Sequence, residues 1–321
     1  MNRHSIRVKG VILTLLTLFF SACADRAVEV KFNRLESVLF ETPSDRLSIE
    51  LMAQRKTFDT PLLNLHPDDP QYMQMLADFV GDSIVRRIFE VTDSMYGDLS
   101  DVEKQLGKAL AKAEKICPEI HYDRFYTLVT ADLDDYQNRV FCSENELALS
   151  IDHYAVGYFP GAVPVYIERL CQRQYIVSDC MAAIARAHIA LSGEEMTLLD
   201  YAIAEGKTLY FLKQTMPSVD DTILMRYTGE QMEWMRENTA NVWAWLLQNK
   251  MLYSKDLSQF HNLIDEAPKT NAFGDGSAPR TPSYIGWQIV RQYMQKSNAT
   301  MQELFDETDS QKILTTAAWR P

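Results

Sequence analysis

The apolar positions of residues 198–212 (LLDYAIAEGKTLYFL) predict a helix that is buried along one side. Leu198, Ala202 and Leu209 are separated by four and seven residues, which places them on one stripe of a helix. Glu205 lies on the same stripe, three residues after Ala202 and four before Leu209. Because an unpaired buried charge is costly, we expect this carboxylate to have a partner. The partner can be a structural hydrogen-bond donor or a functional group.

The same periodicity predicts further helices before and after this segment. They cover residues 72–92, 100–116, 179–191, 228–248 and 283–296. Ser100 and Glu103 have the spacing of a capping box at the start of one of them. A long loop rich in Gly and Pro is expected at 269–282, before the last of these helices.

Three other segments predict β-structure. Val28–Phe32 alternates polar and apolar residues, which is typical of a short strand. Phe125–Leu133 and Arg139–Ile151 are rich in β-branched and apolar residues, and they predict a small antiparallel sheet. The fold class expected from these patterns is therefore α+β and predominantly α-helical.

The order of these elements predicts one domain with two parts. A loop punctuated by Gly and Pro, at 153–164, leaves the predicted sheet, and from about Tyr166 the pattern is mostly helical. We therefore expect a single domain over 23–321. Residues 23–165 would form its α+β part and residues 166–321 its helical part.

The first 22 residues read as a lipoprotein signal peptide. Basic residues precede the apolar run Val11–Phe20, which is too short to span a bilayer. Small residues and then Cys23 follow, as at a lipoprotein cleavage site, so Cys23 is the expected site of lipidation. More than one acyl chain would anchor the protein stably. Such an anchor would place the chain in the cell envelope, at the outer or inner membrane.

The charge of the chain limits its partners. The sequence carries 32 basic and 44 acidic residues, for a net charge of −12. Loss of the signal peptide would make it more acidic still. This balance argues against nucleic acid as a partner and against electrostatic attraction to anionic lipid as the main force at a membrane. The expected partners are the membrane, through the lipid anchor, and other proteins of the cell envelope.

Four cysteines follow the predicted lipidation site, and they leave the disulfide state open. They are Cys117, Cys142, Cys171 and Cys180. An exported chain could join them in two disulfides, but a core of this size does not need them, so four buried thiols are the alternative. The sequence has no CxxC, so redox chemistry and Cys-rich zinc sites are not favoured.

His188 suggests a comparison with zinc peptidases of the gluzincin type. In these enzymes one helix carries HExxH and a following helix supplies a Glu as third ligand. His188 and Glu205 lie on successive predicted helices and could face each other, but the frame ending at His188 reads Ile184-Ala185-Arg186-Ala187-His188. No two of the six His are four residues apart, so HExxH is absent from the sequence. We expect no catalytic residue and no bound zinc, and any metal would have to use His188 and Glu205.

Several blocks of the sequence resemble one family. These are LLDYAIAEGKTLYFL (198–212), YTGEQMEWMRENTANVWAWLL (227–247), LYSKD (252–256) and APRTPSYIGWQIVRQYM (278–294). Together with the lipoprotein signal they resemble the GldB family of gliding-motility lipoproteins from Bacteroidetes, over nearly the whole mature chain. That family is in turn similar to zinc proteases whose EG helix follows HExxH.

The resemblance implies a zincin-like, degenerate peptidase core in which Glu205 matches the third-ligand Glu. It implies a lipid-anchored, non-catalytic envelope protein that binds partners in gliding motility or protein secretion. Surface lipoproteins of Bacteroidetes often carry several acids directly after the lipidated Cys, whereas Asp25 is the one acid in 24–27, so the resemblance favours an anchor that faces the periplasm. Two alternatives remain open. One is a metallopeptidase-like hydrolase that retains a site at His188 and Glu205, near Lys207. The other is a lipoprotein that binds glycans or peptides with Tyr284 and Trp287.

A cleft is expected where the loop at 269–282 meets the following helix. Arg280, Tyr284 and Trp287 combine charge with aromatic surface there. Together with His188, Glu205 and Lys207 they form the candidate vestigial site.

Overall fold

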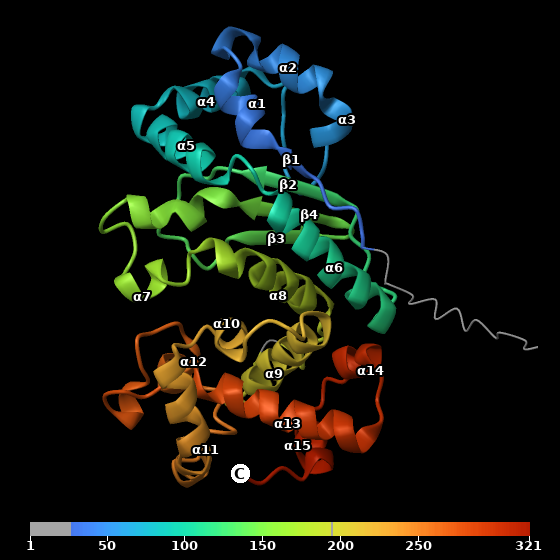
Figure 1. Cartoon of the computed structure of the whole chain (residues 1–321), viewed down its shortest axis with the longest axis vertical. Coiled ribbons are helices and arrows are strands. Elements are labelled where there is room, and N and C mark those ends of the chain that lie inside the picture. Colours follow the sequence, from blue (N-terminus) through green and yellow to red (C-terminus); the bar gives the residue numbers. More distant parts are fainter. Residues whose placement is uncertain (1–26, 194) are drawn as a thin grey trace, which may run out of the picture.

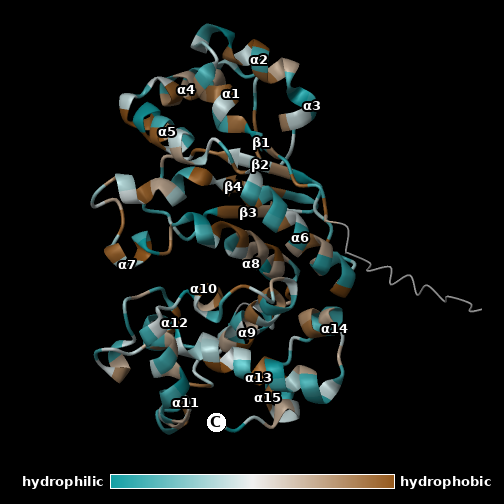
Figure 2. Ribbon diagram, in the orientation of Figure 1, coloured by the Kyte–Doolittle hydropathy of each residue, from teal (hydrophilic) through white to brown (hydrophobic). Residues whose placement is uncertain are grey.

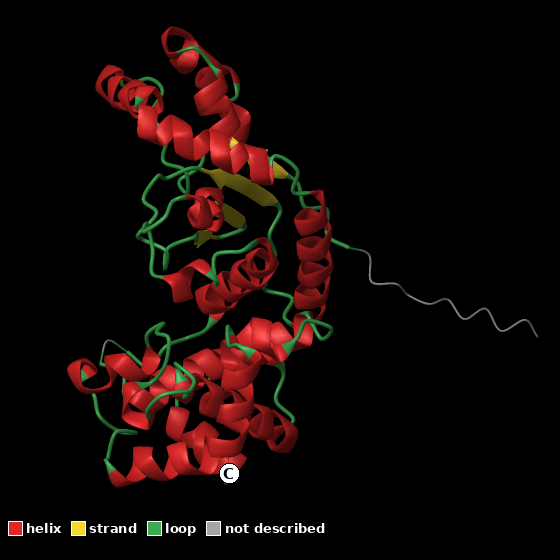
Figure 3. Cartoon of the chain, turned by 60° about the vertical axis from the view of Figure 1, so that its left-hand side comes forward, coloured by secondary structure: helices red, strands yellow, loops and turns green. Residues whose placement is uncertain are grey.

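The computed structural model describes residues 27–193 and 195–321. The predicted signal peptide and Cys23 lie outside these residues. The chain is mostly helical and has one small sheet, which confirms the predicted α+β class with a predominance of helix (Figure 3). In the described residues, no helix is long and apolar enough to cross a membrane.

Figure 1 labels the elements in chain order. The first part of the chain contains β1 (Phe32–Arg34), α1 (Leu35–Glu41), α2 (Leu47–Ala53), α3 (Arg55–Phe58), α4 (Pro70–Gly81), α5 (Ser83–Tyr96), α6 (Ser100–Ile116), β2 (Arg124–Leu128), β3 (Val140–Ser143), β4 (Glu146–Ser150) and the 3-10 helix η2 (Ile151–Tyr158). The second part contains α7 (Val165–Glu168), α8 (Ile176–His188), α9 (Leu198–Thr215), α10 (Asp221–Met225), α11 (Gly229–Gln248), α12 (Leu257–Ile264), α13 (Thr281–Ser297), α14 (Met301–Asp306) and α15 (Ser310–Ala317).

The sheet has four strands in the order β1-β2-β4-β3, and it is mixed. Strand β2 pairs in parallel with β1 on one side and with β4 on the other, while β3 and β4 form an antiparallel pair. The prediction of an antiparallel sheet is therefore confirmed for β3 and β4 and was wrong for both pairings of β2. The reason is that parallel neighbours are joined by long crossovers, here the helices α1–α6 between β1 and β2. Local sequence patterns do not show which distant strand becomes a neighbour.

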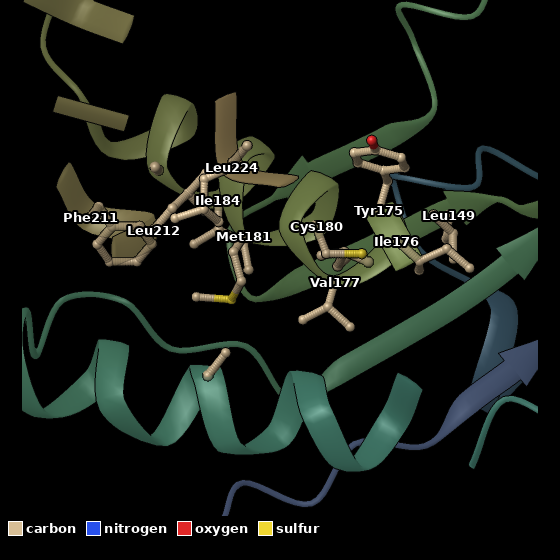
Figure 4. Packing of buried hydrophobic residues seen from close by; sticks show 14 of the residues in the cluster. Leu149, Tyr175, Ile176, Val177, Cys180, Met181, Ile184, Phe211, Leu212 and Leu224 are labelled. Atoms are coloured by element: carbon tan, nitrogen blue, oxygen red, sulfur yellow. The ribbon is translucent and has the colours of Figure 1, made fainter. Parts of the chain in front are cut away.

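The sheet lies between two groups of helices. Figure 1 shows α1–α5 above it, α6 and α8 below it, and the helices from α9 onwards at the far end of the molecule. Hydrophobic residues gather in the strands and in α8, and hydrophilic stretches cover α11 at the periphery (Figure 2). The apolar face of α8 packs on α9 and on the sheet, with Met181 and Ile184 fully buried beside Phe211 and Leu212 (Figure 4).

Helices α9 and α13 cross at two glycines. A Cβ atom built on Gly286 would lie 1.7 Å from the carbonyl oxygen of Ala202. A Cβ atom built on Gly206 would lie 2.4 Å from the carbonyl carbon of Gly286. The two backbones therefore touch, which requires glycine at both positions. This crossing joins two of the sequence blocks that carry the family resemblance.

Two local predictions about helices were wrong. The helix predicted at 72–92 is two helices, because the Asp82 backbone is extended and its carboxylate caps α5 through the amide of Ile84 at 2.8 Å. An apolar period that continues across Asp82 hides this break. The capping box at Ser100 is absent, since Glu103 accepts a hydrogen bond from the amide of Phe32 at 3.0 Å instead.

Two further boundaries differ from the predicted ones. The segment predicted as a loop from residue 153 begins inside η2, whose short turns lie directly after β4. Helix α8 covers Ile176–His188, so it begins and ends three residues earlier than predicted. The four described cysteines are free thiols, and Cys117, Cys171 and Cys180 are buried.

Candidate functional site

A cavity of about 290 Å³ lies where α8, α9, α12 and α13 meet the loop before β3. Its lining is dominated by charged side chains, and it also includes Tyr136, Gln137, Tyr201, Ile264 and Ser283. The charged lining residues are Arg139, Arg186, Glu205, Arg226, Asp265, Glu266 and Arg280. A pocket with this concentration of arginines and carboxylates is the strongest candidate site in the described chain.

Glu205 extends from α9 into this cavity and is held by two arginines. Arg186 of α8 donates to it from Nε and Nη2, at 3.1 and 3.2 Å. Arg280, at the start of α13, donates to it from Nη2 at 2.9 Å. The Glu205 side chain is 26% exposed and that of Arg280 is 8% exposed. The partner expected for this carboxylate is therefore a pair of guanidinium groups.

The two arginines belong to a continuous series of alternating charges, which we call the ion-pair ring because both of its ends lie on α8. It consists of Asp179, Arg186, Glu205, Arg226, Glu266 and Arg280. Asp179 and Arg186 both lie on α8, seven residues apart, so the ring starts and ends on one helix.

The other bonds of the ring are equally close. Arg226 Nη1 lies 2.5 Å from Asp179, and its Nε lies 3.1 Å from Glu266. Arg280 Nη1 lies 3.0 Å from Glu266 and so links Glu266 to Glu205. Arg139, which is not counted in the ring, forms a further ion pair with Asp179, with its Nη2 at 3.6 Å. Each carboxylate of the ring therefore lies between two arginines, which compensates its partial removal from water.

Backbone geometry positions two arginines of the ring. Arg226 ends α10 with φ 63°, and Arg280 precedes α13 with φ 47°. Both angles are in the left-handed region, which residues other than glycine adopt rarely. Such conformations persist where the surroundings fix them, and they gather at functional sites.

The ring also sets the charge state of its members. Burial by itself raises the pKa of Glu205, but the charges of Arg186 and Arg280 outweigh it and lower the pKa from the ordinary 4.5 to about 2. Burial opposes the charge of Arg280 too, and Glu266 and Glu205 raise its pKa above the ordinary value. Glu205 is therefore ionised at neutral pH, and its two oxygens are engaged as acceptors.

His188 does not share this site. Its Nδ1 lies 2.9 Å from the carbonyl oxygen of Ile184 in its own helix, and its ring packs edge-on against Tyr122 with centroids 6.1 Å apart. The residue of α8 that meets Glu205 is Arg186, two positions earlier. The structure therefore does not bring the two candidate metal ligands together. Among the described residues, no group of three or more His, Cys, Asp or Glu is placed to hold a metal ion.

Lys207 points away from the cavity, toward the segment between α14 and α15. Its Nζ donates to the carbonyl oxygen of Glu307 at 2.6 Å, and the residue is 2% exposed. Burial lowers the pKa of Lys207 from 10.5 to about 8, despite the opposing charges of Glu307 and Asp306. Lys207 therefore connects α9 to the C-terminal helices.

This lysine gives a testable pH dependence. Between pH 8 and pH 10.5 the unfolded chain binds a proton at Lys207 that the folded chain has lost, so the free energy of unfolding rises with pH. We expect Lys207→Met to lack this rise. From pH 8 to pH 10.5 the wild type should gain about 2 kcal/mol over the variant, as measured by urea unfolding. Parallel curves for the two proteins would show that Lys207 keeps its ordinary pKa.

Tyr284 and Trp287 also lie outside the cavity. Both are buried, and their rings meet edge-on with centroids 6.3 Å apart. Trp287 lines a separate hollow of about 280 Å³ beside Lys213, Asp221 and Arg291. Of the six residues expected at a vestigial site, the structure brings Glu205 and Arg280 together and places the other four elsewhere.

The sequence alone did not indicate most members of the ion-pair ring. Arg139, Asp179, Arg226 and Glu266 gave no local signal, because their partners lie 14 to 47 positions away. The one available sign was the spacing of seven between Asp179 and Arg186, which places opposite charges on one face of a predicted helix.

Comparisons with known proteins identify the family of the chain. No curated protein and no solved structure matches the chain. A family model described as gliding motility protein GldB matches residues 21–321, which include the predicted lipidation site and all of the described fold. The chain therefore belongs to the GldB family of gliding motility proteins.

Proposed function

We propose that this chain is a non-catalytic, lipid-anchored component of the cell envelope that binds protein partners in gliding motility or protein secretion. Its family supports the link to motility. A lipid on Cys23 would hold it at a membrane, facing the periplasm. Envelope proteins, rather than nucleic acid, would be its partners, since the chain has a net charge of −12.

The observation that carries this proposal is the engagement of Glu205. A zinc ligand or general base must offer a free oxygen or nitrogen to the metal or to the attacking water. Both oxygens of Glu205 accept hydrogen bonds from arginines instead, and His188 is turned toward its own helix and Tyr122. The pair of helices α8 and α9 would then be the scaffold of a zincin-like core that holds an ion-pair ring instead of a metal.

The cavity supplies a suitable surface for a partner. Arg186 is 54% exposed at its rim, so part of its guanidinium can be reached from solvent. Tyr136 and Tyr201 line the same cavity and add aromatic surface to it. Arginine and tyrosine are the residues that most often anchor protein interfaces. We infer that a partner places a polar or acidic segment over this opening.

Anchoring is tested with Cys23→Ala in a strain that lacks the native gene. We expect the wild type in the membrane fraction, with a mass that includes acyl chains. The variant should lose the acyl mass and at least about 90% of its membrane association, because no lipid anchor remains. Normal spreading and secretion by cells carrying only the soluble variant would contradict an anchored role.

Partner binding and catalysis are tested on the anchored protein. A photo-crosslinking residue at Gln137, on the cavity lining, should give a discrete cross-linked species in living cells. The same residue at Gln74, exposed on α4, is the matched control and should give none. Peptide hydrolysis by the purified protein that disappears in Glu205→Gln would overturn the non-catalytic assignment.

A further inference from the structure

Helix α6 carries a row of lysines in an otherwise acidic chain. Lys104, Lys108 and Lys112 are spaced by four residues, which places them along one face of the helix. Lys104 and Lys108 are exposed and Lys112 is half-buried. In the part of the chain that the structure describes, none of the three is within ion-pair distance of a carboxylate. The three carboxylates of α6 contact other groups: Asp101 pairs with Arg173, Glu103 with Lys31, and Glu114 lies 3.0 Å from His121 Nδ1.

The beginning of the described chain crosses this helix. The amide of Val28 donates to the carbonyl oxygen of Gly107 at 3.0 Å. A Cβ atom on Gly107 would lie 2.2 Å from the carbonyl oxygen of Val28, so the two backbones are in direct contact. Gly107 lies between Lys104 and Lys108 in the sequence of α6. The chain that leads to Cys23 therefore leaves the folded body beside the lysine row.

The length of the remaining chain limits how far the anchor can be from this row. Cys23 precedes Ala27, the first described residue, by four positions. A fully extended chain advances at most about 3.6 Å per residue, so the acylated cysteine would lie within about 15 Å of Ala27. A membrane that holds the acyl chains must therefore lie close to α6.

A hollow beside the row has the chemistry of a headgroup site. Its volume is about 220 Å³, and Lys108 and Lys112 contribute to its lining. The other lining residues are Gln105, Ala109, Gln174, Val177, Ser178, Thr215, Met216, Ser218 and Val219. Gln105, Gln174 and Ser218 offer amide and hydroxyl donors, and the lining includes no carboxylate. The hydroxyls of Ser178 and Thr215 donate to backbone carbonyl oxygens instead. Two ammonium groups with neutral hydrogen-bonding neighbours suit a phosphate diester.

We propose that the lysine row and this hollow bind anionic phospholipid headgroups of the membrane in which the protein is anchored. The inference rests on the proposed lipidation of Cys23. The acyl chains provide the membrane affinity, and the lysines set the orientation. Each lysine near an anionic surface favours that arrangement by about fivefold, while the acidic faces elsewhere are repelled.

This orientation leaves the ion-pair ring accessible to partners. Figure 1 shows α6 on one side of the molecule and α7 and α12 on the other. Residues 264–266, at the end of α12, line the cavity. With α6 on the membrane, the cavity opens toward the periplasmic side, where an envelope protein can reach it.

The proposal is tested by lysine footprinting of the acylated protein on vesicles. The protein is reconstituted through its own acyl chains into phosphatidylcholine vesicles with or without 30% phosphatidylglycerol, and acetylated with an N-hydroxysuccinimide ester. We expect acetylation of Lys104, Lys108 and Lys112 to fall at least fivefold on the anionic vesicles. Lys56 and Lys250, which are exposed elsewhere, should react equally on both. Equal reaction of the α6 lysines on both vesicles would overturn the proposal.

Two controls distinguish failure of the headgroup-binding proposal from failure of the lipid-anchor proposal. The triple variant Lys104→Gln/Lys108→Gln/Lys112→Gln should float with neutral vesicles as the wild type does. In this variant, acetylation of Lys115, the remaining lysine of α6, should be the same on neutral and on anionic vesicles. If mass spectrometry finds no acyl chain on Cys23, the anchor proposal fails. The unacylated protein is then tested by flotation at low salt, where binding to phosphatidylglycerol that the triple variant lacks would still support the lysine row, and no binding would overturn it.

Discussion

Gly286→Ala should lower the free energy of unfolding by about 3 kcal/mol or more, and it should leave little folded protein at 37 °C. The added methyl group would lie 1.7 Å from the carbonyl oxygen of Ala202 and 2.4 Å from its carbonyl carbon. The neighbouring atoms belong to the backbone of α9, so a change of side-chain rotamer cannot make room. Helices α9 and α13 would have to separate, and Trp287 and Ile289, buried on α13, would lose contacts.

The matched control is Gly81→Ala. Gly81 is the last residue of α4, and nothing lies within 4 Å of a Cβ atom built there. This substitution should be neutral or stabilise the protein by up to about 1 kcal/mol, because alanine favours helix. Both variants are compared with the wild type by urea unfolding followed by circular dichroism. If Gly286→Ala unfolds at the same urea concentration as the wild type, the helices do not cross at these glycines.

This contact joins two sequence blocks that are distant along the chain. Gly206 belongs to the block at 198–212, and Gly286 belongs to the block at 278–294. The periodicity of each block predicted a helix, and both helices are confirmed. The pairing of the two glycines could not be predicted, because a glycine within a helical pattern does not indicate which helix approaches it.

The same limit applies to the sheet and to the candidate site. Residues 125–128 and 146–150 were correctly assigned to strands, since β-branched and apolar residues favour that backbone. Their parallel pairing depends on chain crossovers and was missed. At the site, the need of Glu205 for a partner followed from its neighbours in sequence. The identity of that partner depended on Arg280, which is 75 positions away.

The second variant with a large expected effect on stability is Glu205→Gln, in the ion-pair ring. Glu205→Gln should lower the free energy of unfolding by about 3 kcal/mol at pH 7. A neutral amide cannot balance Arg280, whose side chain is 8% exposed and would retain Glu266 alone as its ionic partner. The loss of the Glu205 charge would cost less at Arg186, because its side chain is 54% exposed and water can solvate the guanidinium. Removal of one member of a buried pair costs more than the pair contributes, because the remaining charge stays out of water.

The pH dependence of this effect identifies its cause. The pKa of Glu205 is about 2 in the folded chain and near 4.5 in the unfolded chain. Its contribution is therefore complete above about pH 5 and is lost as the pH falls toward 2. The difference between wild type and Glu205→Gln, measured by urea unfolding, should shrink by more than half between pH 7 and pH 3. Glu230→Gln, at an exposed position on α11, is the control. It should change the free energy of unfolding by no more than about 0.5 kcal/mol at either pH. A difference that stays constant from pH 7 to pH 3 would mean that the variant acts through packing, and that the ring does not hold Glu205 in its ionised form.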